Sequence, residues 1–189
     1  MLWVIRCDGT AGNGATMGRD DLTPPDGPYA ELFLQLADLI EAESEEGRPV
    51  YFKTTIAIGS EVAKVGGTIF EEDRIFVDLY RRDGAHVPGD GIDECITLAH
   101  ELGHVRSITE GHVTLEQWRD FRDVDALEHP TSASAETRAD YLAEEERAWA
   151  VAHSVLRDLG FEDCETFNEI RRRELEDYRC GLFGSHDAS

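Results

Sequence analysis

The sequence predicts an α+β fold, in which a small, mostly antiparallel sheet separates an N-terminal helix from a helical C-terminal part. Two observations predict it. Before residue 91, short apolar runs rich in β-branched and aromatic residues are punctuated by glycines, which is typical of strands and turns. After residue 91, apolar residues recur at helical spacing over long stretches. A length of 189 residues suits one domain better than two independent cores.

The N-terminal half is expected to contain one helix and four extended segments. A short strand is predicted at 2–6, followed by a glycine-rich loop at 9–18. A helix is expected to begin near Pro28 and to end before Gly47, because the apolar residues between them fall on one face. The predicted sheet consists of three segments, at 50–58, 61–70 and 74–80.

The C-terminal half is expected to be helical. Its predicted helices lie at 92–107, 115–121, 137–159 and 164–179, and a loop is expected at 123–134. The single domain, residues 1–189, then divides into three parts. They are the N-terminal strand, loop and helix at 1–49, the sheet at 50–90, and the C-terminal helices at 91–189.

The chain is strongly acidic, with 40 Asp plus Glu against 18 Lys plus Arg and a formal net charge of −22. Such a charge repels phosphate backbones and anionic lipid surfaces, so neither nucleic acid nor a membrane is expected as a partner. Solubility is the simplest role for this charge. Attraction of a basic substrate or partner is the alternative.

The cysteines and the N-terminal residues favour a cytoplasmic location. Four widely separated cysteines form no CxxC pair, namely Cys7, Cys95, Cys164 and Cys180. The first residues lack the basic start and the longer apolar segment of a signal peptide, and no later segment is apolar enough to span a membrane. We therefore expect reduced thiols in the cytoplasm, with two distant disulfides in an exported protein as the alternative.

One motif carries chemistry: residues 100–104 read HELGH, an HExxH sequence. One helical turn separates His100 from His104, so both imidazoles can meet one metal ion from the same helix face. Glu101 can then reach a zinc-bound water and act as its general base. The sequence therefore predicts a Zn²⁺ cofactor. The alternative is a pair of core histidines that are hydrogen-bonded to carbonyl groups.

Zinc in a catalytic site needs a third protein ligand and an open position for water. A longer zincin pattern is excluded because Ser107 and Glu110 stand where it would place Gly and His. Glu145 falls inside the apolar stripe of the helix at 137–159, and its two flanking glutamates project to either side. A carboxylate in such a stripe needs a partner, and zinc would be one. An ion pair with an arginine is the alternative.

These features resemble the ImmA/IrrE-like zinc metallopeptidases. The likeness rests on the HELGH helix after a small sheet and on residues 145–149, EERAW, which resemble the Glu-x-x-Ala segment of that family. It covers residues 50–159. The resemblance implies a zincin-like fold of the gluzincin type, with His100, His104 and Glu145 as zinc ligands and Glu101 as the base.

The resemblance also implies an activity, namely zinc-dependent hydrolysis of peptide bonds in a protein or peptide substrate. An edge strand, expected at 74–80, would bind the substrate in extended form. The long separation between His104 and Glu145 implies an insertion, which bears Trp118, Phe121 and His129. Two other classes remain open: a catalytically inactive zincin-like interaction module and a metal-free helical adaptor.

A second donor to the oxyanion is expected in such an enzyme. The sequence does not select one among four candidates, which are His112, His129, Tyr141 and Tyr178.

Overall fold

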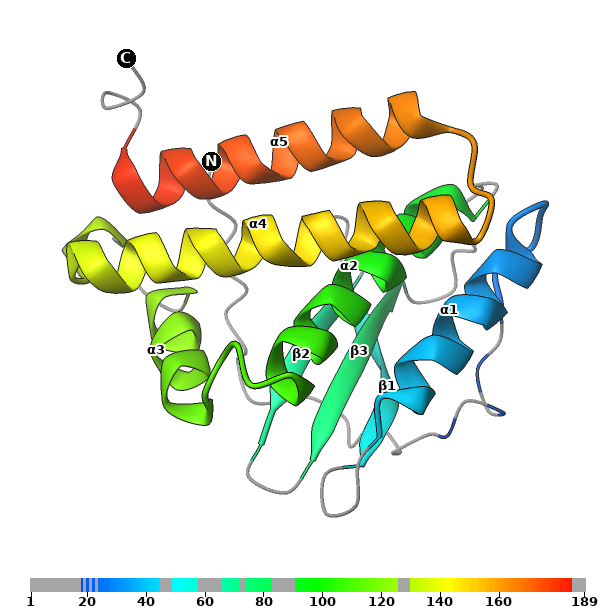
Figure 1. Ribbon diagram of the computed structural model, residues 1–189, viewed down its shortest axis with the longest axis horizontal. Coiled ribbons are helices and arrows are strands. Elements are labelled where there is room, and N and C mark those ends of the chain that lie inside the picture. The colour runs from blue at the N-terminus through cyan, green and yellow to red at the C-terminus, as the bar shows by residue number, and fades with distance from the viewer. Residues whose placement is uncertain are drawn as a thin grey trace.

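Figure 1 shows the computed structural model of the chain, which describes residues 18, 20, 22, 24–44, 49–57, 66–71, 74–82, 91–125 and 130–184. The strand predicted at 2–6, most of the predicted glycine-rich loop and His129 lie outside these residues. The described elements, in chain order, are α1 (Ala30–Ala42), β1 (Val50–Ala57), β2 (Gly66–Phe70), β3 (Ile75–Arg82), α2 (Ile92–Thr109), α3 (Leu115–Asp125), the short 3₁₀ helix η2 (Pro130–Ser132), α4 (Ala135–Asp158) and α5 (Cys164–Phe183). Helices and one small sheet are both present, as an α+β chain requires.

The sheet differs from the prediction in its strand directions. Its order is β1-β3-β2, with β3 parallel to β1 and antiparallel to β2. A mostly antiparallel sheet was therefore the wrong expectation, because the longer of the two ladders is the parallel one. The physical reason is the path of the chain. Strand β2 runs opposite to β1 at the other edge of the sheet, and β3 then turns back between them, in the same direction as β1. Apolar alternation within a strand does not encode this direction.

The position of β3 also corrects the expectation that the strand at 74–80 is an edge strand. Among the described strands, β3 is paired on both sides, while β1 and β2 form the edges. Ile75 and Val77 of β3 are fully buried, which fits a central strand. The edge that borders α2, the helix with the HExxH segment, is β2, because β2 contacts α2.

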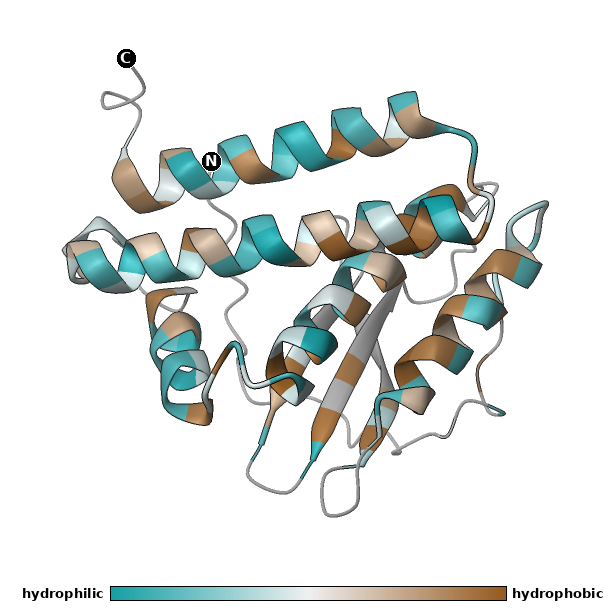
Figure 2. Cartoon of the chain, viewed as in Figure 1, coloured by the Kyte–Doolittle hydropathy of each residue, from teal (hydrophilic) through white to brown (hydrophobic). Residues whose placement is uncertain are grey.

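The helices form a layer over the sheet and a further layer beyond it (Figure 1). Helices α1 and α2 lie side by side on one face of the sheet, α4 crosses α2, and α5 runs back along α4. The buried residues of α5 are Phe167, Leu175 and Leu182, whose spacing forms one narrow stripe. Hydrophilic residues occupy much of the remaining surface of α5 (Figure 2). This helix therefore covers α4 on its outer side.

The predicted helices are confirmed, with shifted ends. Helix α3 continues to Asp125 because Val124, which is 3% exposed, extends the apolar spacing of Trp118 and Phe121. The loop predicted at 123–134 is thus wrong in its first residues, and η2 occupies part of the rest. Helix α4 begins at Ala135, two residues early, because the Ser134 hydroxyl accepts a hydrogen bond from the Thr137 amide at 3.0 Å.

None of the helices in the described ranges combines the length and the hydropathy of a membrane span. Cys95, Cys164 and Cys180 form no disulfide among the described residues, and Cys7 lies outside them.

Candidate metal centre

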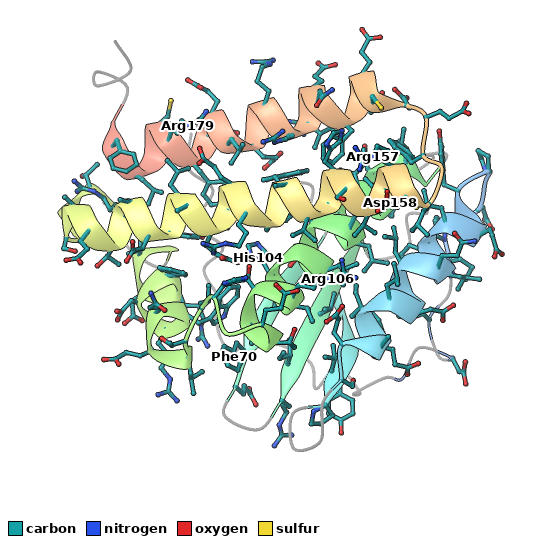
Figure 3. All side chains as sticks on the ribbon, in the orientation of Figure 1. Phe70, His104, Arg106, Arg157, Asp158 and Arg179 are labelled. Atoms are coloured by element: carbon teal, nitrogen blue, oxygen red, sulfur yellow. The ribbon has the colours of Figure 1, made fainter. Side chains whose placement is uncertain are left out.

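The HExxH segment lies on α2, in the interior between the sheet and α4. Every residue from Leu98 to Val105 is buried. Helix α2 begins after Gly91, which has a φ of 85° and packs so closely on Pro25 that a Cβ there would lie 2.7 Å from its ring. This start directs the helix along the sheet. In Figure 3, His104 lies between α2 and α4.

Gly103 sets the distance between α2 and α4. A Cβ on this residue would lie 2.5 Å from the carbonyl oxygen and 2.6 Å from the Cα of Ala148. The two backbones therefore meet without an intervening side chain, and they do so next to His104 on one helix and one turn from Glu144 and Glu145 on the other. The glycine of HELGH thus allows α4 to bring its carboxylates to the histidines.

The structure brings the three predicted ligands together. The Nε2 atoms of His100 and His104 lie 3.1 Å apart. Glu145 approaches them with Oε2 at 3.3 Å from His100 Nε2 and Oε1 at 3.7 Å from His104 Nε2. All three residues are buried, and one ligand atom from each lies within 4.8 Å of the others. Two imidazoles and a carboxylate thus converge on one point.

The same geometry fits a zinc ion. Ligands about 2.0–2.2 Å from a tetrahedral zinc lie roughly 3.3–3.5 Å from one another. The shortest separations between the three residues range from 3.1 to 3.7 Å, with Glu145 offering Oε2 to His100 and Oε1 to His104. Among the described residues the cluster contains these three side chains and no further His, Cys, Asp or Glu. Two histidines and one carboxylate form a donor set that zinc accepts.

Glu144 contacts the other nitrogen of His104, a role that the sequence did not reveal. Its Oε1 lies 3.0 Å from His104 Nδ1, and its Oε2 accepts a hydrogen bond from Arg147 at 2.5 Å. Only 1% of the Glu144 side chain is exposed. A carboxylate on Nδ1 keeps the proton there, so that Nε2 presents its lone pair to a metal. Glu144 stands three residues after Tyr141 and four before Ala148, which both lie on the buried face of α4. Helical spacing therefore places Glu144 on that face as well as it places Glu145.

Two tryptophans fix the imidazole rings. The ring of Trp149 lies 4.3 Å from that of His100, and the ring of Trp118 lies 5.5 Å from that of His104. His100 Nδ1 is buried and has no hydrogen-bond partner among the described residues. The nitrogens of both histidines otherwise contact side chains, so the alternative of two histidines bonded to carbonyl groups finds no support in the described part of the chain.

The carboxylates around His104 favour the protonated, cationic form of its imidazole. Burial of the imidazole lowers its pKa, but Glu145, Glu144 and Glu101 together outweigh burial and raise the pKa from the ordinary 6.5 to about 9. The site therefore attracts positive charge, and a divalent cation satisfies the same carboxylates more fully than a proton does.

Glu101 lies beside the cluster and outside its ligand set. Its Oε2 accepts a hydrogen bond of 2.7 Å from Thr68 Oγ1 on β2, and the residue is 4% exposed. It is also near enough to His104 to raise the pKa of that imidazole. Glu101 thus lies beside the three candidate ligands without belonging to their set, as the general base of a metal site must.

The candidates for the second donor that the structure describes contact residues outside the three-residue cluster. His112 is half exposed and pairs with Glu110 at 3.2 Å. Tyr141 stacks on Phe121, and Tyr178 packs against Tyr141. The helix of the expected insertion, α3, places Trp118 against His104, so this segment forms part of the wall of the site. The predicted second donor is not assigned to any of them.

Comparison of the chain with protein-family models, with curated proteins and with solved structures finds no match. The resemblance to the ImmA/IrrE-like metallopeptidases therefore stays a prediction, which rests on the residues of this chain.

Proposed function

We propose that the protein is a zinc-dependent metallopeptidase with a zincin-like arrangement, similar to the ImmA/IrrE-like enzymes. The observation that carries the proposal is the convergence of His100, His104 and Glu145 within zinc-ligand separations, with Glu101 held beside them. Three protein ligands leave one tetrahedral position for water, as catalytic zinc sites do. When bound, zinc would acidify that water and polarise the carbonyl of the scissile peptide bond.

The residues of the chain divide the work as follows. His100 and His104 would hold the ion through their imidazoles, and Glu145 would supply the carboxylate ligand. Glu101 accepts a proton from water as the water attacks the peptide carbonyl, and it then transfers that proton to the departing amine. The proton that leaves the water thus ends on the new amino group, and the hydroxyl group ends on the new carboxyl group.

Among the described strands, the outer edge of β2 has no neighbour and offers a place for the peptide. This edge borders α2 and carries the hydrogen bond to Glu101. A peptide in extended form that pairs with an exposed strand is held by main-chain hydrogen bonds, which orient its carbonyl groups without requiring a particular sequence. The role assigned above to the strand at 74–80 thus passes to β2.

Metal analysis tests the ligand set directly. Zinc should be measured by elemental analysis in protein purified without chelator, in wild type and in three variants. Wild type should contain about one zinc per chain, and both His100→Ala and Glu145→Ala should lose it. Glu146→Ala is the matched control, since Glu146 is exposed and pairs with Arg179 on α5. Zinc retained without Glu145 would move the third ligand elsewhere.

Peptide cleavage tests the reaction. Glu101→Gln should retain zinc and lose cleavage of a quenched fluorescent peptide library by about 100-fold or more. A zinc-loaded wild type that cleaves no better than Glu101→Gln would support the inactive interaction module. A wild type that takes up no zinc after supplementation would support the metal-free adaptor.

A further inference from the structure

One hydrogen bond joins the edge of the sheet to the proposed general base. Thr68 Oγ1 donates to Glu101 Oε2 at 2.7 Å, across 33 positions of sequence and between β2 and α2. Glu101 is 4% exposed, so water cannot readily hydrate its carboxylate. A buried carboxylate requires donors, and Thr68 supplies one from a different element of the fold.

The donor is held firmly. Threonine is β-branched, which restricts its χ1 angle, and its backbone belongs to a strand that is paired with β3 through Val77. Because Oε2 is engaged by the hydroxyl, the other oxygen of Glu101 is the one that exchanges a proton with water. We infer that Thr68 is the positioning residue of Glu101. The inference rests on the proposed function and adds to it a residue outside the HExxH motif.

The register of β2 links this contact to the substrate edge. The Glu71 amide donates to the Arg74 carbonyl at 2.9 Å, so this pair is hydrogen-bonded across the ladder. Hydrogen-bonded and non-hydrogen-bonded pairs alternate in an antiparallel ladder, which makes Thr68 and Val77 a non-hydrogen-bonded pair. The amide and carbonyl of Thr68 therefore face away from β3, towards the edge that no other described strand covers. A peptide that adds to β2 would pair with the residue whose side chain orients the base.

The test separates the hydroxyl from the shape of the side chain. Thr68→Val keeps the branched shape and removes the donor, whereas Thr68→Ser keeps the donor. With Thr68→Val we expect kcat for peptide cleavage to fall about 10- to 100-fold, because the base is no longer held in one orientation. Zinc content and KM should stay close to the wild-type values. Thr68→Ser should restore most of kcat.

A second threonine–glutamate contact provides the matched control. Thr109 Oγ1 donates to Glu43 Oε2 at 3.4 Å, where the last residue of α2 meets the residue after α1. Thr109→Val makes the same exchange there and should leave kcat unchanged. The inference is overturned if Thr68→Val cleaves as well as wild type, or if Thr68→Ser is no better than Thr68→Val.

Failure of the proposed function has a different signature, because wild type would then show no cleavage that depends on Glu101. Thermal unfolding of Thr68→Val and Glu101→Met, alone and combined, still tests the hydrogen bond between Thr68 and Glu101 in that case. Methionine keeps the length of the side chain and removes the acceptor. Thr68→Val should lower the unfolding midpoint in wild type and not in Glu101→Met. Equal losses in both backgrounds would overturn the inference.

Discussion

Within the described part of the chain, α2 packs mainly against two helices, α1 and α4, and the interiors that it shares with them differ in chemistry. Helix α1 contributes only apolar side chains to its buried set, which comprises Phe33, Leu36, Ala37 and Ile40. Helix α4 contributes Glu144 and Glu145, which meet His100 and His104 of α2. Burial of an apolar side chain stabilises a fold by about 1.5–3 kcal/mol, whereas burial of ionisable groups costs free energy unless they have partners. The side of α2 that faces α1 therefore contributes mainly to stability, and the side that faces α4 carries the candidate metal ligands.

The largest loss of stability is expected from a substitution at Gly103, where the backbones of α2 and α4 lie closest. Gly103→Ala places a Cβ 2.5 Å from a backbone oxygen of α4, which cannot move aside as a side chain would. We expect a loss of at least about 3 kcal/mol in the free energy of unfolding, together with loss of bound zinc. Urea denaturation and elemental analysis measure the two effects.

Gly111→Ala is the control for this variant. Gly111 has a φ of 75° and nothing within 4 Å of the added Cβ, so only backbone strain of about 1–2 kcal/mol is expected, with zinc retained. Equal losses in the two variants would mean that contact between the helices is not what holds the site.

The apolar interface should respond differently to truncation. Leu36 is fully buried, and Leu36→Ala should lower the free energy of unfolding by about 2–5 kcal/mol through lost apolar contact and the cavity left behind. The folded fraction should still bind one equivalent of zinc. Zinc release from protein that circular dichroism shows to be folded would contradict the separation between the two interfaces.

The pH dependence of stability should distinguish the zinc-free from the zinc-loaded protein. The pKa of His104 rises from 6.5 to about 9 in the folded chain. Protonation of His104 therefore stabilises the folded, zinc-free protein, and this stabilisation is fully present below pH 6.5. That stability is lost as the pH rises towards 9. The urea concentration at the unfolding midpoint should fall over this pH range for zinc-free protein. It should not fall for zinc-loaded protein, because the ion takes the place of the proton. If zinc-free protein were equally stable at pH 6.5 and pH 9, the raised pKa of His104 would be refuted.

The smallest effects compare a buried carboxylate with a more exposed one. Glu144→Gln removes the anionic partner of His104 Nδ1 and should weaken zinc binding about 10- to 100-fold, as measured by competition with a chromophoric chelator. Glu43 pairs with Arg106 on the α1 side of α2, at 2.8 Å and with both side chains partly exposed. Glu43→Gln should change stability by under about 1 kcal/mol and leave zinc affinity unaltered. Similar zinc affinities in the two variants would remove the proposed role of Glu144.

Most of this site was visible in the sequence, for a physical reason. A motif within one helix places its side chains by helical geometry alone, so His100, Glu101 and His104 needed no tertiary information. Glu145 could also be predicted, because a carboxylate in an apolar stripe indicates a buried partner. Glu144 was missed because the stripe was taken as narrower than it is. The buried face of α4 spans two adjacent positions where Gly103 lets the helices touch.

The sheet was less predictable than the helices. Strand alternation indicates which residues are buried, but neither the order β1-β3-β2 nor the parallel pairing of β1 with β3 follows from it. The contact between Thr68 and Glu101 depends on that order, because it requires β2 at the edge beside α2. The tertiary part of the site thus lay beyond the pattern of the sequence.

The distance along the chain between the two halves of the metal centre has a consequence for biosynthesis. Glu144 follows His104 by 40 positions, with α3 between them. A growing polypeptide exposes both imidazoles long before the helix with the carboxylates has left the ribosome. With the ligands proposed here, a firmly held ion therefore marks a molecule in which α4 has already docked, and metal retention in cell extracts would report the fraction of newly made chains that have matured.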